Sequence, residues 1–195
     1  KVAPEHMSDN ALYYMGKPSF SVYEQFRERY ARINQKLGRK QYLVPYLMSS
    51  HPGATLDDAI LLAEYLNRVG YMPEQVQDFY PTPGTLSTAM YYTEIDPRTM
   101  KPVYVAKTAE EKAMQRALLQ WRRPDKRPIV LAALKKAGRE DLIGFGKECL
   151  IRPARGEKPP VSSSRTAKSA KNARPTAHRP AAPKKKGWAK AKRKK

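Results

Sequence analysis

The sequence predicts an α/β fold in which a small parallel sheet is followed by a mostly helical extension and a disordered basic tail. Strand-like and helix-like segments alternate over residues 1–88, and each strand-like segment leads into a polar loop. Residues 89–152 keep helical patterns. Residues 153–195 contain few large apolar side chains among Lys, Arg, Ala, Ser and Pro, too few to offset the entropy of ordering. The chain therefore divides into residues 1–88, 89–152 and 153–195.

The first strand and helix are predicted within residues 1–16. Residues 1–4 form a short apolar run, and polar side chains at residues 8–10 can accept hydrogen bonds from the free N–H groups of a helix that follows. Gly16 then ends the helix. A second helix is predicted from a capping box of Ser21 and Glu24 to about Leu37. Its apolar positions recur at helical spacing and predict one buried stripe: Val22, Phe26, Tyr30, Ile33 and Leu37.

Two further strands are predicted at residues 42–48 and 76–79. Residues 42–48 lack polar alternation and therefore predict a strand buried on both faces, although Pro45 removes one donor from the ladder. Strands joined by helical crossovers run parallel. Three strands cannot close a barrel and would leave an exposed edge. Either strands upstream are missing, or the three form a small sheet that the rest of the chain covers.

The remaining helices are predicted from caps and apolar spacing. Thr55 and Asp58 form a capping box for a helix that ends at Gly70, and Thr108 and Glu111 form one for a helix through Leu119. Shorter helical segments are expected at residues 86–92, 127–137 and 140–143, and a short extended piece at residues 101–105.

Composition excludes several kinds of protein. The net charge is +20, and residues 152–195 hold 16 basic residues against one acidic residue. Cys149 is the only cysteine, so this chain alone has no disulfide framework, thiolate zinc site or iron–sulfur site. No apolar run reaches the ~20 residues that a membrane helix needs, so no membrane partner is expected. These features favour a cytoplasmic location, and the absence of an initiator Met suggests a fragment.

Three loops and the extension resemble a known family. The runs at residues 1–6 (KVAPEH), 45–53 (PYLMSSHPG) and 78–85 (DFYPTPGT) resemble the later strands of the YgiQ family of radical SAM proteins. The runs at residues 90–93, 121–124 and 142–144 resemble that family's C-terminal extension. The resemblance covers about residues 1–152. It implies a partial parallel (β/α) barrel that comprises about the last three βα units.

The resemblance also implies a chemistry for the full-length protein. Radical SAM enzymes hold a 4Fe–4S cluster on an early CxxxCxxC loop, and the reduced cluster cleaves S-adenosylmethionine to a radical that abstracts hydrogen. An external electron donor and a substrate, here unknown, are implied as partners. This sequence has no such motif. We therefore expect this chain alone to bind neither cofactor and to be inactive.

The predicted site lies at the carboxyl ends of the strands, where parallel α/β folds bind ligands. By resemblance, Glu5 and Ser8 lie near the ribose or methionine moiety, Ser49 at the fifth-strand position, and Phe79 and Tyr80 beside adenine. Each has a structural alternative: Glu5 can accept from a helix N-terminus, the serines can form loops or caps, and the aromatic rings can pack in the core. His6 and His51 favour loop hydrogen bonds over metal binding, and no metal ligand is assigned.

Two other functions are compatible with the sequence. The tail at residues 153–195 carries Lys184, Lys185 and Lys186 and a basic C-terminal run at residues 190–195 with Trp188 between, which can bind nucleic acid non-specifically. The chain could thus be a non-catalytic module that associates with nucleic acid through this tail. Alternatively, its Pro-Gly-Thr turn resembles those of methylthiotransferases that modify tRNA, which would require a second cluster or an RNA-binding domain upstream.

Overall fold

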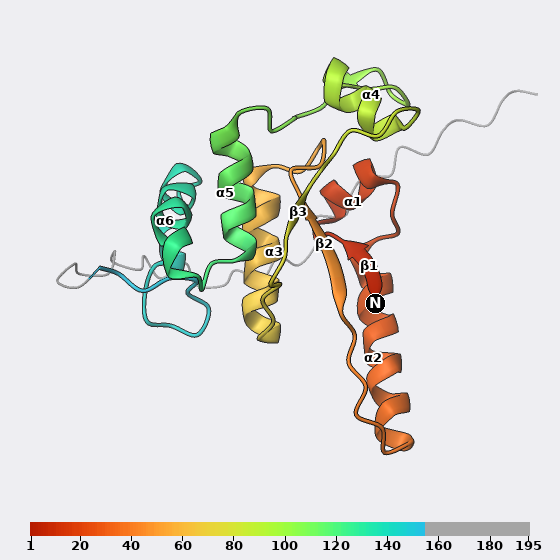
Figure 1. Ribbon diagram of the computed structural model, residues 1–195, viewed down its shortest axis with the longest axis vertical. Coiled ribbons are helices and arrows are strands. Elements are labelled where there is room, and N and C mark those ends of the chain that lie inside the picture. The colour runs from red at the N-terminus through yellow and green to blue at the C-terminus, as the bar shows by residue number, and fades with distance from the viewer. Residues whose placement is uncertain (155–195) are drawn as a thin grey trace, which may run out of the picture. The chain divides into compact units, whose positions relative to one another are not determined.

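A computed structural model describes residues 1–154 of the chain (Figure 1). Three parallel strands form one sheet in the order β1-β2-β3, with β1 at Val2–Glu5, β2 at Pro45–Ser49 and β3 at Gln77–Asp78. Helix α1 (Asp9–Met15) and helix α2 (Phe20–Lys36) connect β1 to β2, and helix α3 (Leu56–Val69) connects β2 to β3. The predicted α/β fold with a small parallel sheet is therefore confirmed, and the described residues form an open sheet.

The chain beyond β3 is mostly helical, as the sequence predicted. Helix α4 (Leu86–Thr93) leads into a short antiparallel pair, β4 (Ile95–Asp96) and β5 (Lys101–Pro102). The elements that follow are α5 (Ala109–Leu119), the 3-10 turn η1 (Pro124–Lys126), α6 (Arg127–Lys136) and the 3-10 turn η2 (Glu140–Leu142).

The caps explain where α1, α3 and α5 begin and end. The capping boxes predicted for α3 and α5 are present: the hydroxyl of Thr55 accepts from the Asp58 N–H, and that of Thr108 accepts from the Glu111 N–H. Ser8 occupies the N-cap of α1, and Gly16 ends α1 with a left-handed backbone (φ +67°). Ser8 makes no side-chain cap bond, however, so its hydroxyl is free to bond elsewhere.

One apolar core joins α3 to α5 and α6, which lie side by side in Figure 1. It includes Ile60 and Leu66 from α3, Leu118 from α5 and Leu134 from α6. Trp121 is also buried, with 2% of its surface exposed. The core therefore contains residues from both sides of position 88.

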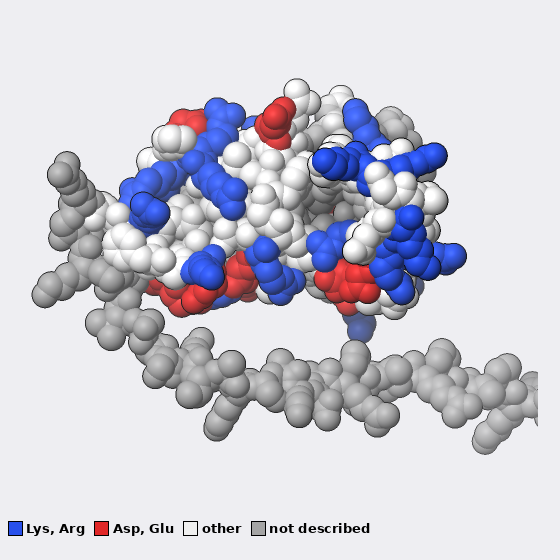
Figure 2. Space-filling view, turned by 90° about the horizontal axis from the view of Figure 1, so that it is seen from below, with Lys and Arg blue, Asp and Glu red and all other residues white. Residues whose placement is uncertain are grey.

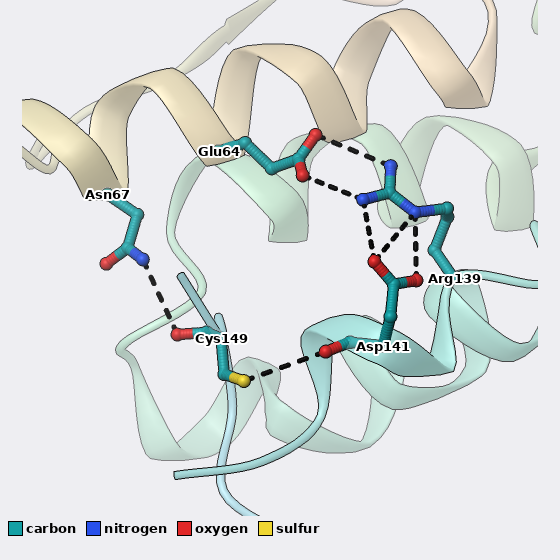
Figure 3. Close-up of polar contacts among 5 residues, drawn as sticks. All are labelled: Glu64, Asn67, Arg139, Asp141 and Cys149. Atoms are coloured by element: carbon teal, nitrogen blue, oxygen red, sulfur yellow. Dashed lines mark hydrogen bonds and ion pairs between the residues drawn. The ribbon is translucent and has the colours of Figure 1, made fainter. Parts of the chain in front are cut away.

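A second set of contacts ties the chain after α6 to α3 (Figure 3). The guanidinium of Arg139 binds the carboxylate of Glu64 (Nη2–Oε1, 2.7 Å) and that of Asp141 (Nε–Oδ1, 3.0 Å). Asn67 of α3 donates to the carbonyl of Cys149 (3.5 Å), and the Cys149 thiol donates to the carbonyl of Asp141 (3.6 Å). The cysteine thus belongs to a structural loop contact.

Helix α2 differs from its prediction in two respects. It begins at Phe20 with Ser19 as N-cap, so the Ser21–Glu24 capping box is wrong, because Ser21 already lies inside the helix. The predicted buried stripe is also wrong, since no residue of α2 is buried. Val22, Phe26 and Ile33 are 52%, 45% and 47% exposed, because no described element packs against that side.

Strand β2 is shorter and less buried than predicted. It starts at Pro45, where the missing N–H removes no inner ladder bond. Leu47 is buried against the core, but Tyr42, Val44 and Tyr46 are 83%, 47% and 40% exposed. The prediction of a strand buried on both faces is therefore wrong for the described residues, which cover only the face toward α3.

Two further expectations concern the C-terminal tail and membrane helices. Residues 155–195, which make up most of the predicted disordered tail, lie outside the described residues. Within the described part, no helix is long and apolar enough to cross a membrane.

Candidate functional site at the carboxyl ends of the strands

The parallel order brings the carboxyl ends of the three strands to one edge of the sheet. Glu5 pairs in register with Leu47, and Ser49 with Asp78. The N–H of Phe79 donates to the carbonyl of Ser49 at 2.8 Å, so the loop after β3 starts beside the end of β2. Polar side chains from three separate stretches of sequence therefore meet at this edge.

Two residues at this edge hold the backbone in the left-handed region. Glu5 has φ +63° and Ser50 has φ +61°, a conformation that costs about 1–3 kcal/mol for a residue other than glycine. Ser50 is 1% exposed, and its Oγ has no hydrogen-bond partner among the described residues. Such strain and an unpaired buried hydroxyl are typical of positions that serve a ligand or a function.

Gln115 of α5 fixes the loop that follows β2. Its Oε1 accepts from the Ser50 N–H at 2.9 Å, and its Nε2 donates to the Ala54 carbonyl at 2.8 Å. Gln115 is buried, so both bonds are shielded from water. Helix α5 therefore sets the shape of the loop that presents Ser50.

Asp58 links the end of β1 to the start of α3. Its carboxylate accepts hydrogen bonds from the Ser8 hydroxyl, from Asn10 Nδ2 (2.9 Å) and from Thr55 N–H (2.9 Å). Burial alone would raise the pKa of Asp58, but these hydrogen bonds outweigh burial and lower that pKa. The charged carboxylate thus stabilises the loop that carries Ser8.

Both histidines near the edge make loop hydrogen bonds, as the sequence favoured. His6 Nδ1 accepts from the Ser8 N–H at 3.0 Å, and His51 contacts Ser87 Oγ through Nε2 at 2.9 Å. Burial lowers the pKa of His6 from 6.5 to about 4 and also lowers the pKa of His51. Both imidazoles are therefore neutral at pH 7.

The third strand end combines a carboxylate with an aromatic ring. Asp78 accepts from the Ser49 hydroxyl and pairs with Arg116 of α5. The ring of Phe79 lies edge-on to His51, with 5.0 Å between centroids, and is half-buried. Tyr80, by contrast, is 77% exposed.

The structure brings some predicted site residues together and not others. Glu5, Ser49 and Phe79 lie at strand ends that are neighbours in the sheet. Glu5 is paired with Lys17 (3.1 Å) rather than with a helix N-terminus, and Ser8 is bonded to Asp58. Three residues that support the strand-end site were not predicted as site residues: Asp58, Gln115 and Arg116. The capping box marked Asp58 as a structural residue, but no local pattern indicated a role for the other two.

A large hollow lies beside β2 and β3. It has a volume of about 1150 Å³ and is lined by the exposed side of β2, the chain from 71 to 78 and side chains of α5 such as Arg116. None of the five predicted site residues lines it. It nevertheless reaches Asp78 and Arg116, so it adjoins the third strand end.

Comparison with known proteins places the chain in a family. A family model described as a domain of unknown function, DUF3362, matches residues 74–195. The chain belongs to the DUF3362 family. It is also 64% identical over 152 residues to a UPF0313 protein of Clostridium perfringens (strain SM101 / Type A), and 60% identical over 151 residues to a UPF0313 protein of Clostridium botulinum (strain 657 / Type Ba4). No solved structure matches the chain.

This DUF3362 member corresponds to one part of longer proteins. The matches cover 78% and 77% of this chain but only 23% and 24% of the two UPF0313 proteins, so the chain spans about a quarter of their length. The match lies in the C-terminal part of those proteins. The residues of the strand-end site thus lie in the stretch that the chain shares with these relatives.

The site's donors suit an organic polar ligand better than a metal ion. The described residues contain no group of three or more His, Cys, Asp or Glu side chains that could hold a metal. The carboxylates of Asp58 and Asp78 already accept several hydrogen bonds from the protein. The chemical capacity that remains lies in one buried hydroxyl, the carboxylate of Glu5 and aromatic surface from Phe79.

Proposed function

We propose that residues 1–88 form the last part of a radical SAM (β/α) barrel within a longer protein and contribute the strand ends that face S-adenosylmethionine. The observation that carries this proposal is the parallel order β1-β2-β3, in which Glu5, Ser49 and Phe79 approach one edge. An open parallel sheet with helical crossovers is the expected form of a partial barrel, and active sites in such barrels lie at the carboxyl ends of strands.

Some side chains at this edge keep a polar group or ring surface that is available to bind S-adenosylmethionine. The Ser50 hydroxyl is buried and lacks a partner among the described residues, so it can bond to a polar ligand atom. Phe79 is half-buried and can border an adenine ring, while the exposed Tyr80 can close over it. Bound S-adenosylmethionine would supply radical hydrogen abstraction from an unidentified substrate.

Ser8 and Ser49 support the site in a different way. Their hydroxyls donate to Asp58 and Asp78, so we assign them a positioning role rather than direct contact with the ligand. Both carboxylates are held by further partners, Asn10 for Asp58 and Arg116 for Asp78. This support keeps the strand ends in one shape.

The 4Fe–4S cluster does not fit the described residues. They lack a metal-binding group, and Cys149, the only cysteine in the sequence, contacts the Asp141 carbonyl far along the chain from the strand ends. The cluster ligands in this proposal come from the remaining three quarters of the longer protein.

The test joins the upstream polypeptide of the Clostridium perfringens relative to Lys1 of this chain. After anaerobic incubation with iron and sulfide, the joined protein should be brown and should release deoxyadenosine from S-adenosylmethionine under dithionite. A brown protein that releases no deoxyadenosine would contradict the proposal.

A variant series tests the part played by Ser50. Ser50→Ala and Ser50→Gly both remove the hydroxyl, and the glycine variant also relieves the left-handed backbone. In the joined protein, each should weaken binding of S-adenosylmethionine about 3- to 10-fold, the value of one hydrogen bond. Ser21→Ala, on exposed α2, is the matched control. Unchanged affinity in both Ser50 variants would remove Ser50 from the site.

A further inference from the structure

A smaller hollow lies among the helices α3, α5 and α6. It has a volume of about 420 Å³ and is lined by the first turn of α3, by α5 and by the C-terminal end of α6. Tyr104, which precedes α5, completes the lining. A hollow of this volume falls within the range of pockets that bind small organic molecules.

Part of the lining is apolar. Met114 of α5 is buried, and Leu56 of α3 and Ala137 at the C-cap of α6 are half-buried. Because all three side chains face the same hollow, a ligand that fills it would bury an apolar group against them. Removal of such a group from water favours binding.

Charged side chains of both signs line the same hollow. The carboxylates of Asp57 and Glu111 lie on one side of the charge balance, and the ammonium group of Lys136 lies on the other. No ion pair to Asp57 or Lys136 is found within residues 1–154. Hydrogen bonds from Thr108 lower the pKa of Glu111, and the charge of Lys136 lowers it further. Opposite charges therefore line the hollow without contacting each other.

Tyr104 holds one of these carboxylates and joins the hollow to a neighbouring loop. Its hydroxyl donates to Glu111 Oε1 at 3.2 Å. Burial and the charge of Glu111 raise the pKa of Tyr104 to about 12, so the hydroxyl keeps its proton at pH 7. The carbonyl of Tyr104 accepts from the Gly53 N–H at 2.7 Å. The position of Glu111 is thus fixed relative to the loop at residues 50–55.

We infer that this hollow binds an apolar α-amino acid. The ammonium group of the ligand pairs with Asp57 and Glu111, and its carboxylate pairs with Lys136. Its side chain packs against Leu56 and Met114. A simple anion would leave the two carboxylates unpaired and be repelled by them, and a simple cation would leave Lys136 unpaired. A zwitterion pairs with both signs at once.

The bound amino acid would lie beside the residue that holds the strand-end loop. Gln115 lines the hollow, and its side chain bonds to the Ser50 N–H at 2.9 Å and to the Ala54 carbonyl at 2.8 Å. Binding should therefore shift the nuclear magnetic resonance signal of the Ser50 amide as well as those of the lining residues. Neither effect requires S-adenosylmethionine, so the inference stands apart from the proposed function.

Titration of the 195-residue chain with leucine, followed by amide chemical shifts, tests the inference. Leucine should bind with a Kd of about 1 mM or lower. Two analogues each lack one charge: 4-methylpentanoate has no ammonium group, and 3-methylbutylamine has no carboxylate. Each should bind at least about 10-fold more weakly than leucine. No shift of the lining amides by leucine at about 10 mM, or equal binding of either analogue, would overturn the inference.

Variants locate the two charged contacts. Lys136→Met should weaken leucine binding about 10-fold and leave the binding of 3-methylbutylamine unchanged, whereas Asp57→Asn should weaken both. Both side chains are exposed, so the variants keep the fold. Lys135→Met is the matched control, because Lys135 is exposed on the same helix but does not line the hollow. If leucine binds Lys136→Met as tightly as the parent chain, or if the control variant loses as much affinity, the hollow is not an amino-acid site.

Discussion

Gly53 lies where a tyrosine ring touches the backbone. Its φ is +86°, and a Cβ built there would lie 2.0 Å from Cδ2 of Tyr14. We expect Gly53→Ala to destabilise the protein by about 2–4 kcal/mol, because the left-handed backbone and the clash add. Urea denaturation of the chain measures this change in the free energy of unfolding.

Gly84 is the matched control for this prediction. It has φ +79°, but no atom lies within 4 Å of the position that a Cβ would take there, so Gly84→Ala should cost only about 1–2 kcal/mol. An equal loss of stability in the two variants would show that the Tyr14 ring moves aside without cost. If adding Tyr14→Ala to the Gly53→Ala variant restores stability, the ring is the cause of the loss.

His6 should make stability depend on pH. Burial lowers its pKa from 6.5 to about 4, while Asp58 opposes and His51 adds to the lowering. The unfolded chain therefore binds a proton below pH 6.5 that the folded chain binds only below about pH 4, so stability falls as pH falls through this window. From pH 7 to pH 5 the loss due to His6 should be about 2 kcal/mol.

His6→Asn separates this effect from other groups. Asparagine keeps an acceptor for the Ser8 N–H but does not titrate. Urea denaturation at pH 7 and pH 5 should show a smaller loss in the variant, with the remainder due to His51, whose pKa burial also lowers. The same loss in both proteins would mean that His6 is protonated in the folded chain.

At the scale of elements, the Arg139 contacts should hold the chain after α6 in place. The carboxylates of Asp141 and Glu64 raise the pKa of Arg139 above its ordinary value, so the guanidinium stays charged. Arg139→Met should reduce local stability by about 1–2 kcal/mol and speed hydrogen exchange in residues 140–152 roughly 5- to 30-fold.

Arg123→Met is the control, because Arg123 forms an exposed pair with Asp125 two residues away. That pair should contribute less than about 1 kcal/mol. If both variants exchange alike, the contacts in Figure 3 do not fix the loop.

The sequence predicted where helices begin better than it predicted which elements pack against them. Thr55 with Asp58 and Thr108 with Glu111 marked two helix starts correctly, because a cap is a contact between residues three apart. The stripe of α2 was recognised but wrongly assigned to the core. Spacing shows that one side is apolar, but it does not show whether a partner lies within the same chain.

For the candidate site too, the sequence predicted which loops meet but not the contacts that hold them. Parallel strands predicted which loops meet, because their carboxyl ends share an edge. The bonds from Gln115 to Ser50 and from Asp58 to Ser8 join residues 65 and 50 positions apart. Such contacts depend on how α5 and α3 pack, and no local pattern encodes them.

At the scale of the molecule, the charge is divided between two parts. Residues 1–151 carry 22 basic and 17 acidic residues, and on the face drawn in Figure 2 acidic side chains lie among the basic ones. We propose that any binding of nucleic acid by the chain depends on residues 153–195. We expect the chain to bind single-stranded RNA at low salt and to lose this binding on truncation after Pro153.

The salt dependence tests whether phosphate contacts are responsible. Affinity measured by fluorescence anisotropy should fall steeply between about 50 and 200 mM salt, because each neutralised phosphate releases counterions. Polyglutamate of matched length is the control for general polyanion binding. If the truncated chain binds as tightly as the full chain, the folded part holds the RNA and the tail does not.

The shared core has a consequence for the boundary of the family. The DUF3362 match begins at residue 74, between α3 and β3, yet Leu118 and Leu134 inside it are buried together with Ile60 and Leu66 outside it. A recombinant product that starts at this boundary would lack the core residues that α3 and β2 contribute. Gene rearrangements that break the chain at residue 74 should therefore give unstable products, because the folding unit extends to the N-terminal side of the family boundary.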